Sequence, residues 1–225
     1  LMGMSGNNVK ILLDGIPLID RGATKQSLSQ LDVNSIERVE IVEGPMSVVY
    51  GTDALAGVIN IITKKGDGYS EENTWRVGAR VQEESMGKEY DFFKDKGLHN
   101  ESIDLGFNHK SGLFVNGGYT RNNHGGWQGD LTGREKRWHP KDQALMNGMF
   151  GFQNRNMNVW YRLDFLDEKI FGPNNGSELQ PEKVSDKDFL TKRYTHQLQS
   201  DWKLDNRLDV HAALSYQDYK RRTRT

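Results

Sequence analysis

The stretch IERVEIVEGPMSVVYGTDALAGVINIITKK, residues 36–65, decides the fold of the first part of this chain. Within it, residues 37–43 alternate charged and apolar side chains, which predicts a β-strand. Gly44 and Pro45 follow, and they predict a sharp end to that strand because glycine permits unusual backbone angles and proline lacks an N–H donor. Residues 58–63 are an almost unbroken β-branched run, which predicts a second strand covered on both faces.

The alternation in residues 37–43 separates two faces of the first strand. Val39 and Ile41 share one face, and Arg38 and Glu40 share the other. We therefore expect this strand to be half-buried. Between the two strands, residues 46–56 contain a threonine and an aspartate that could cap a short turn of helix.

The residues before this stretch predict the rest of a small domain. Residues 9–13 read as a strand, and Asp14-Gly15 reads as its turn. Residues 27–36 place apolar side chains at roughly helical spacing after serines that could cap, so we expect a short helix there. The pattern by itself also allows a small α+β domain without ligand chemistry.

Three strings in this region resemble the end of the plug domain of TonB-dependent outer-membrane receptors. They are LLDGIP at 12–17, IERVEIVEGP at 36–45 and YGTDALAGVINIITK at 50–64, in the order and spacing of the family. Glu43 departs from the family, which usually has a basic residue before the Gly-Pro pair. The resemblance implies a structural role for the motif residues Asp14, Gly15, Pro17, Arg38, Glu40, Gly44, Pro45, Tyr50, Gly51, Gly57 and Asn60.

Composition independently favours β-structure and excludes several classes of function. The 225 residues include 30 basic and 31 acidic side chains, so no global charge attracts nucleic acid. There is no cysteine, which excludes a disulfide scaffold and a cysteine-rich zinc site. The 24 glycines and 10% aromatic residues favour strands joined by many turns. No stretch approaches the length of a membrane-spanning apolar helix.

The pattern changes after residue 65, and Gly66-Asp67-Gly68 reads as a linker. We therefore divide the chain into residues 1–68, the C-terminal half of a plug domain, and residues 69–225, the N-terminal part of a β-barrel. The second part contains seven segments with period-two alternation. Their apolar faces lie in residues 75–81, 103–107, 113–119, 144–152, 157–165, 194–204 and 208–216.

The connections between these segments alternate in length. Residues 109–112, 153–156 and 205–207 read as tight turns, whereas residues 83–100, 122–142 and 167–193 read as long loops. Strands of about ten residues joined in this way are typical of a transmembrane β-barrel. Aromatic residues suited to interface girdles are Trp75, Tyr119, Tyr161, Trp202 and Tyr216. A soluble sheet with an aromatic core would alternate similarly and stays an alternative.

The predicted fold class is thus mainly β, a small α+β plug segment followed by about seven antiparallel strands of a partial transmembrane barrel. Receptors of the family close about twenty-two strands. We therefore expect this chain to be an excised piece of such a receptor; the alternative is a truncated product that folds by another route. The resemblance implies that a signal sequence, a TonB-contacting segment and the first half of the plug would precede it.

Enzyme chemistry is not indicated. The glycines at 44 and 51 lack the spacing and the Lys-Ser or Lys-Thr of a phosphate loop, and no His-Glu-x-x-His motif occurs. We expect no catalytic residue, no cofactor and no resident metal. Six histidines are scattered through the predicted barrel. By resemblance to haem receptors, His124 or His139 could be an axial ligand, although a solvated loop histidine is the commoner case.

The loop at residues 122–142 is the best candidate for ligand contact. It combines Trp127 and Trp138 with the basic residues Arg134 and Arg137. Aromatic surfaces beside cationic groups suit an anionic or aromatic chelate. The alternative is that the loop is simply solvated.

The resemblance implies a function in outer-membrane uptake of a scarce nutrient, such as a ferric siderophore, cobalamin or haem. Its partners would be this nutrient chelate, outer-membrane lipid, and TonB through a segment missing from this chain. The alternative is a soluble β-rich binding or adhesion module without transport. Because seven strands leave two edges and one apolar face uncovered, we expect the isolated chain to form a homo-oligomer or to need detergent.

Overall fold

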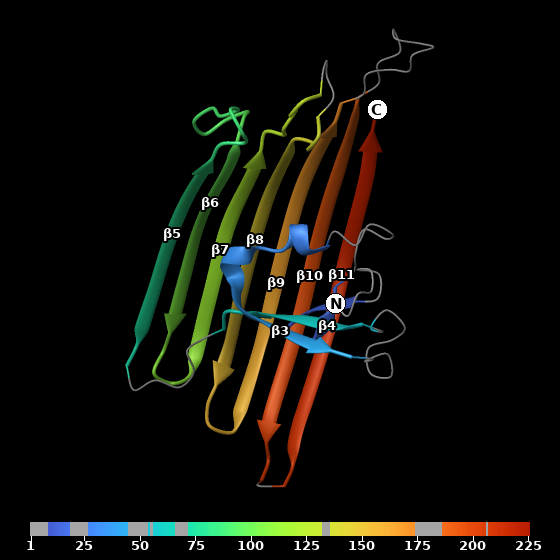
Figure 1. The fold of residues 1–225 in the computed structure, drawn as a ribbon. Helices are drawn as coiled ribbons and strands as arrows, with labels where there is room; N and C mark the ends of the chain where they lie inside the picture. The colour runs from blue at the N-terminus through green and yellow to red at the C-terminus, as the bar shows by residue number, and fades with distance from the viewer. Residues whose placement is uncertain are drawn as a thin grey trace. The chain divides into compact units, whose positions relative to one another are not determined.

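The computed structural model describes residues 9–18, 27–44, 54, 56–65, 72–131, 136–173, 186–205 and 207–225 (Figure 1). The chain divides into two compact units, residues 1–65 and residues 66–225. The predicted boundary between residues 68 and 69 lies outside the described residues and stays a prediction.

Unit 1 contains a four-stranded sheet with the strand order β2-β1-β4-β3. Its strands are β1 (Val9–Leu13), β2 (Ile16–Pro17), β3 (Ile36–Glu43) and β4 (Gly57–Thr63). Strand β4 pairs in parallel with β1 and antiparallel with β3, so it is central. Leu12 of β1 and Val58 of β4 pack with Ala54 in a buried cluster. The apolar run predicted at 58–63 therefore lies where two neighbouring strands exclude water.

Strand β3 differs from its prediction. Val39 is 51% exposed and Ile41 is 57% exposed, so the strand is not half-buried. It lies at the edge of the sheet and has one neighbour, β4. The alternation of side chains shows that one face is suitable for burial, but it does not supply the element that would cover that face.

The segment predicted as a short helix, residues 27–36, does not form an α-helix. Two 3₁₀ turns occupy the segment, η2 (Ser27–Gln30) and η3 (Val33–Ser35). The cap of η3 is Asp32 and not a serine, because the Asp32 carboxylate accepts a 3.0 Å hydrogen bond from the Asn34 amide. A segment this short cannot offset the cost of nucleating an α-helix. The helix predicted within residues 46–56 lies almost wholly outside the described residues. In the part of the chain that the structure describes, no helix is long and apolar enough to cross a membrane.

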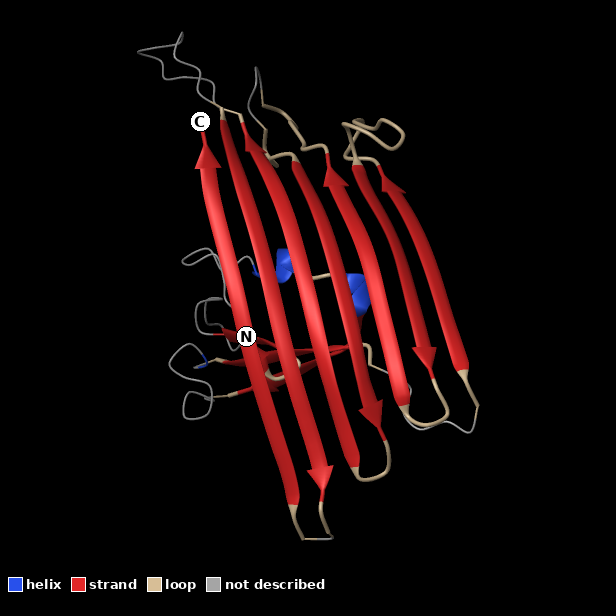
Figure 2. Ribbon diagram, turned by 180° about the vertical axis from the view of Figure 1, so that it is seen from behind, coloured by secondary structure: helices blue, strands red, loops and turns tan. Residues whose placement is uncertain are grey.

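Unit 2 is a single antiparallel sheet in which every strand pairs with its neighbours in sequence (Figures 1 and 2). The strands are β5 (Thr74–Glu84), β6 (Leu98–Asn108), β7 (Leu113–His124), β8 (Lys141–Gln153), β9 (Met157–Gly172), β10 (Lys187–Lys203) and β11 (Asp209–Arg224). The predicted number of strands and their antiparallel order are confirmed.

One face of this sheet is apolar and exposed to solvent. A single cross-strand row contains Trp75, Phe107, Val115, Phe150, Tyr161, Leu198 and Leu214. At the two ends of the row, Trp75 is 77% exposed and Leu214 is 70% exposed. Large apolar side chains arranged this way need lipid or another apolar surface to cover them. The fold class predicted from alternation is therefore confirmed, and we call this the apolar face of the sheet.

The connections lie at opposite ends of the sheet according to their length, as Figure 1 shows. The turns after β6, β8 and β10 are short, whereas those after β5, β7 and β9 are longer. The third long loop was predicted too long, because β9 continues to Gly172 and β10 begins at Lys187. Ion pairs between Lys169 and Asp188 at 3.1 Å and between Lys192 and Asp167 at 3.2 Å join these strand ends. At these strand ends charged residues replace the alternating apolar ones, but the backbone pairing between β9 and β10 continues.

Candidate functional site

The turn between β1 and β2 is fixed by Asp14, whose side chain is buried. Asp14 has a φ of 49° and Gly15 a φ of 82°, the left-handed conformations of a tight hairpin turn. The Asp14 carboxylate accepts hydrogen bonds from the Thr63 amide at 3.1 Å and the Thr63 hydroxyl at 2.7 Å. Lys65 Nζ lies 3.6 Å from Asp14 Oδ1. Asp14 thus ties the turn to the end of β4.

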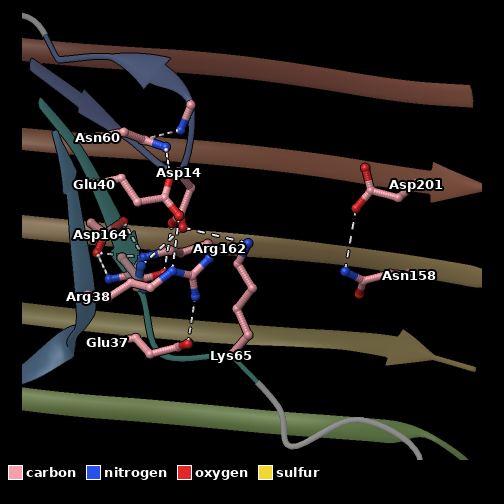
Figure 3. Close-up of polar contacts among 12 residues, drawn as sticks. Asp14, Glu37, Arg38, Glu40, Asn60, Lys65, Asn158, Arg162, Asp164 and Asp201 are labelled. Atoms are coloured by element: carbon pink, nitrogen blue, oxygen red, sulfur yellow. Dashed lines mark hydrogen bonds and ion pairs between the residues drawn. The ribbon is translucent and has the colours of Figure 1, made fainter. Parts of the chain in front are cut away.

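Asn60 connects this turn to the outer strand β3 (Figure 3). Its Oδ1 accepts a hydrogen bond from the Gly15 amide at 2.9 Å, and its Nδ2 donates to Glu40 Oε2 at 3.2 Å. Arg38 Nε donates to Glu40 Oε1 at 3.0 Å, and Arg38 Nη1 donates to Glu37 Oε1 at 2.8 Å. The hydrogen bond to Glu40 is the main reason that the pKa of Arg38 is raised. The network joins three segments that are far apart in sequence.

Two glycines of the motif have positive φ angles. Gly44 has a φ of 114°, and its amide donates to the Ala56 carbonyl at 3.3 Å. Gly57 has a φ of 140°, and a Cβ at this position would lie 2.3 Å from the Val42 carbonyl oxygen. Both positions therefore need glycine.

Of the four remaining predicted motif residues, the structure describes one. Pro17 pairs with Leu12 in the β1–β2 hairpin. Pro45, Tyr50 and Gly51 lie outside the described residues. The structural role of the motif stays a prediction, which the contacts of Asp14 and Asn60 support.

In the predicted ligand loop, Trp127 and Trp138 are brought together. Each amide donates to the other's carbonyl, at 2.9 and 3.0 Å. Their ring centroids are 5.4 Å apart with an angle of 57° between the ring planes. Trp138 is half exposed, and its ring also lies 5.9 Å from that of His124. The two indoles form an aromatic surface held by backbone hydrogen bonds.

Arg137 supplies a cation beside this aromatic surface. Its guanidinium carbon lies 5.8 Å from the Trp127 ring centroid, within cation–π range. Its Nη2 lies 3.8 Å from Asp130 Oδ2, an exposed and weak pairing. Arg134 lies outside the described residues. Three of the four predicted contact residues are therefore adjacent, and such a group could hold a flat anionic molecule.

The two loop histidines are engaged locally. His124 Nδ1 accepts a 2.9 Å hydrogen bond from the Gly126 amide, and burial, followed by the charge of Lys141, lowers the pKa of this histidine. His139 Nδ1 lies 3.1 Å from the Phe171 carbonyl oxygen, to which it donates. Among the described residues, no three His, Asp or Glu side chains are placed to hold a metal ion together. Haem ligation by either histidine stays a prediction.

A polar ladder that the sequence did not predict lies on the face opposite the apolar face. Asn100 donates to Asn122, Asn122 Nδ2 donates to Gln143 Oε1 at 3.4 Å, and Gln143 Nε2 donates to Glu168 Oε2 at 2.6 Å. These residues form one row across β6, β7, β8 and β9. Both Gln143 and Glu168 are 1% exposed. The sequence places these polar residues opposite the predicted apolar face, and that position was the available indication of the ladder. The strand register is needed to show that they lie side by side.

A second unpredicted cluster holds the loop between β5 and β6. The Glu83 carboxylate accepts hydrogen bonds from His99 Nδ1 at 2.6 Å, the Tyr90 hydroxyl at 3.2 Å and the Phe93 amide at 3.4 Å. Desolvation by itself would raise the pKa of Glu83, but these hydrogen bonds outweigh it and lower the pKa. The carboxylate thus favours the folded loop in its ionised form.

Comparison with known families agrees with the motif geometry. Residues 1–58 match the family described as the TonB-dependent receptor plug domain. Over 79 residues the chain is 40% identical to the vitamin B12 transporter BtuB of Vibrio vulnificus (strain CMCP6). That alignment covers 35% of this chain and 13% of the transporter.

Comparison with solved structures gives the fold of the whole chain. The ferric enterobactin receptor PfeA, solved in complex with BCV-L6, matches 98% of the chain with a TM-score of 0.69 and 17% identity. The siderophore receptor PirA from Pseudomonas aeruginosa matches 99% with a TM-score of 0.66 and 15% identity. The chain spans 34% and 35% of these two proteins. At such low identity the likeness shows the fold.

Proposed function

We infer that this chain belongs to the TonB-dependent outer-membrane receptors, and from that premise we propose that it takes part in the uptake of a scarce nutrient. The observation that carries the proposal is the plug sequence at residues 1–58 followed by a seven-stranded sheet with an exposed apolar face. Receptors of this kind lie in the outer membrane, and this chain is located there. The apolar face is suited to contact with the lipid.

The nutrient is a bulky chelate, either a ferric siderophore, cobalamin or haem. The named relatives support the first two classes, since one is a vitamin B12 transporter and another is a ferric enterobactin receptor. Loops at the outer end would capture the chelate, and movement of the plug, driven by TonB, would admit it.

We propose that Trp127, Trp138 and Arg137 form part of the capture surface, together with Arg134. The support is the indole pair with a guanidinium 5.8 Å from one ring, held on a loop between two barrel strands. A flat aromatic or anionic group can stack on the indoles and pair with the cation. No covalent step is involved, and the named relatives are a transporter and receptors.

The alternative function, a soluble adhesion module, is less well supported. It would require the large apolar side chains of the sheet to lie inside a core, but Trp75 and Leu214 are mostly exposed. Water is a poor medium for such a face.

The test is ligand binding by the complete receptor carrying Trp127→Ala and Trp138→Ala. Loss of an aromatic contact at a binding hot spot weakens affinity by about tenfold or more. Trp75→Ala is the matched control, because it removes an exposed indole from the apolar face. Heat-modifiable gel mobility would establish that all variants form a barrel. Unchanged affinity of the loop variant for ferric siderophores, cobalamin and haem would refute the capture surface.

A further inference from the structure

The loop between β5 and β6, residues 85–97, carries an exposed pair of aromatic rings at the long-loop end of the sheet (Figure 1). Phe92 is 67% exposed and Phe93 is 46% exposed. Their ring centroids are 4.4 Å apart and the ring planes meet at 73°, an edge-to-face contact. Single exposed apolar side chains are common on protein surfaces, whereas neighbouring ones indicate a contact surface. Neither ring belongs to the capture surface proposed above.

The backbone around this aromatic pair is strained. Phe93 has a φ of 58° and Asp95 a φ of 54°, in the left-handed region that bulky side chains rarely adopt. A tight turn holds them there, because the Asp91 amide donates to the Lys96 carbonyl at 2.9 Å and the Lys94 amide donates to the Asp91 carbonyl at 3.4 Å. Such strain persists only where surrounding contacts fix it, and it is concentrated at functional segments. The loop therefore has a fixed shape, and its contacts show which surface it meets.

Glu83, at the end of β5, tethers the loop. Its carboxylate accepts hydrogen bonds from the Phe93 amide at 3.4 Å and from the Tyr90 hydroxyl at 3.2 Å. The Tyr90 ring lies 6.2 Å from the His99 ring, and a Cβ on Gly97 would lie 3.1 Å from the Tyr90 ring. The loop thus packs against the side chains of Glu83 and His99.

Strand alternation places these two side chains on the apolar face of the sheet. Glu83 follows Trp75 and Val81 at even spacing along β5, so all three point to one side. His99 is the partner of Glu83 in the β5–β6 register and shares its side with Phe107. The loop therefore folds over the side of the sheet that carries the exposed apolar residues, and not over the side of the polar ladder.

The tether lies just beyond the edge of the apolar face. Val81 is 62% exposed and is the last apolar residue on this face of β5. Glu83 is two residues further on, which is about 7 Å along the strand, or about 5 Å along the membrane normal for a strand tilted by about 40°. Because the Phe93 amide is bonded to Glu83, the aromatic pair lies at the level where hydrocarbon gives way to lipid headgroups.

The charges of the loop are compatible with this position. Residues 85–97 contain three lysines and three carboxylates, so the loop has no net charge for an anionic membrane surface to repel. Asp91 and Lys94 flank the two phenylalanines. Apolar rings between charged neighbours suit a membrane interface, because the rings can enter the apolar layer while the charged groups stay hydrated.

We propose that Phe92 and Phe93 form a membrane anchor: the β5–β6 loop folds back along the outside of the sheet and inserts both rings among the lipids of the outer leaflet. The occupant of this surface is lipid because the aromatic pair is continuous with the apolar face of the sheet. The Glu83 hydrogen bonds and the strained turn fix the depth of the rings. The proposal rests on the outer-membrane location of the receptor and does not depend on which nutrient it transports.

Spin labels on single introduced cysteines measure this depth, and residues 1–225 contain no cysteine of their own. The complete receptor, with any other cysteine replaced, is reconstituted in vesicles of phosphatidylethanolamine and phosphatidylglycerol. Labels at Phe92→Cys and Phe93→Cys are compared with Val81→Cys, the lipid reference, and with Asp130→Cys on the β7–β8 loop, where the side chain is almost fully exposed. We expect the ratio of oxygen to nickel-chelate collisions at residues 92 and 93 to exceed that at residue 130 by at least about fivefold, because oxygen concentrates in hydrocarbon. Ratios equal to that at residue 130 would overturn the anchor.

A second label tests the rings without replacing them. A label at Lys94→Cys sits beside the pair, and changing Phe92 and Phe93 together to serine should lower its collision ratio about threefold. Trp75→Ser is the matched control, because it removes an exposed ring from the other end of β5 on the same face. An equal fall with Trp75→Ser would show that the rings do not hold the loop at the membrane. Heat-modifiable gel mobility would establish that each variant forms a barrel.

Adding ferric siderophore, cobalamin or haem separates the anchor from ligand capture. The collision ratio at residue 92 should be the same with and without each chelate. A water-like ratio that changes only when a chelate is added would assign the rings to capture and overturn the anchor. If no chelate bound the receptor but the lipid-like ratio remained, only the uptake function would fail.

Discussion

Replacing Asp14 by alanine should destabilise the plug sheet strongly, whereas Asp14→Asn should be tolerated. The Asp14 carboxylate accepts hydrogen bonds from both the amide and the hydroxyl of Thr63, and Thr63 is completely buried. Alanine would leave both donors without this acceptor. Asparagine keeps one carbonyl oxygen for the amide and offers an N–H group to the hydroxyl oxygen.

The magnitude follows from these contacts. A buried amide without its acceptor costs about 1–3 kcal/mol, and the hydroxyl adds about 1 kcal/mol. The φ of Asp14 is 49°, a conformation that costs alanine about 1 kcal/mol but that asparagine adopts readily. We therefore expect a loss of about 3–5 kcal/mol for Asp14→Ala. For Asp14→Asn we expect at most about 1 kcal/mol, mainly from the partly exposed pair with Lys65.

Hydrogen exchange in the complete receptor measures this difference locally. A loss of about 3 kcal/mol corresponds to roughly 100-fold faster exchange of the β1 and β4 amides. Amides of β7 and β8 are the internal control, since the change lies in the other unit. Equal acceleration by alanine and asparagine, or a loss below about 1 kcal/mol for alanine, would show that the Thr63 contacts do not stabilise the sheet.

Three further predictions concern the turns, a loop and the uncovered sheet. Gly57→Ala should destabilise the plug more than Gly44→Ala, because its Cβ would meet a backbone oxygen at 2.3 Å whereas that of Gly44 meets nothing within 4 Å; equal thermal unfolding would contradict this. Because the pKa of Glu83 is lowered, its hydrogen bonds stabilise the loop at residues 85–97 above its ordinary pKa of 4.5 and are lost as the pH falls through the lowered value. The protection factors of amides in this loop, which correct for the slower intrinsic exchange at low pH, should fall on acidification, and Glu83→Gln should abolish that fall. Light scattering of the isolated chain in detergent-free buffer should reveal oligomers, and a stable monomer would contradict the need to cover the apolar face.

The sequence by itself determined the strands and their faces. Side chains alternate with a period of two along any strand, so the apolar faces in residues 75–81 and 208–216 could be assigned without knowing their neighbours. The turn at Asp14-Gly15 was also predictable from local sequence, because a tight hairpin turn depends on the backbone preferences of two adjacent residues. The proximity of Trp127, Trp138 and Arg137 was expected because all three lie in one loop, at residues 122–142.

Pairing between distant segments was decided by the tertiary structure. Asn60 contacts Gly15 and Glu40 only because β4 lies between the first hairpin and β3. The ladder from Asn100 to Glu168 depends on the register of four strands. A one-residue slip in any of them would turn these side chains to the other face.

The extent and the exposure of elements also required the structure. Residues 167–172 look like loop because charges interrupt the apolar alternation, but inter-strand hydrogen bonds do not depend on hydrophobicity, so β9 continues. Strand β3 looks half-buried, yet burial depends on what packs against a face and not on the face itself. Local periodicity is encoded residue by residue, whereas contacts between segments 70 or more residues apart arise only when the sheet has formed.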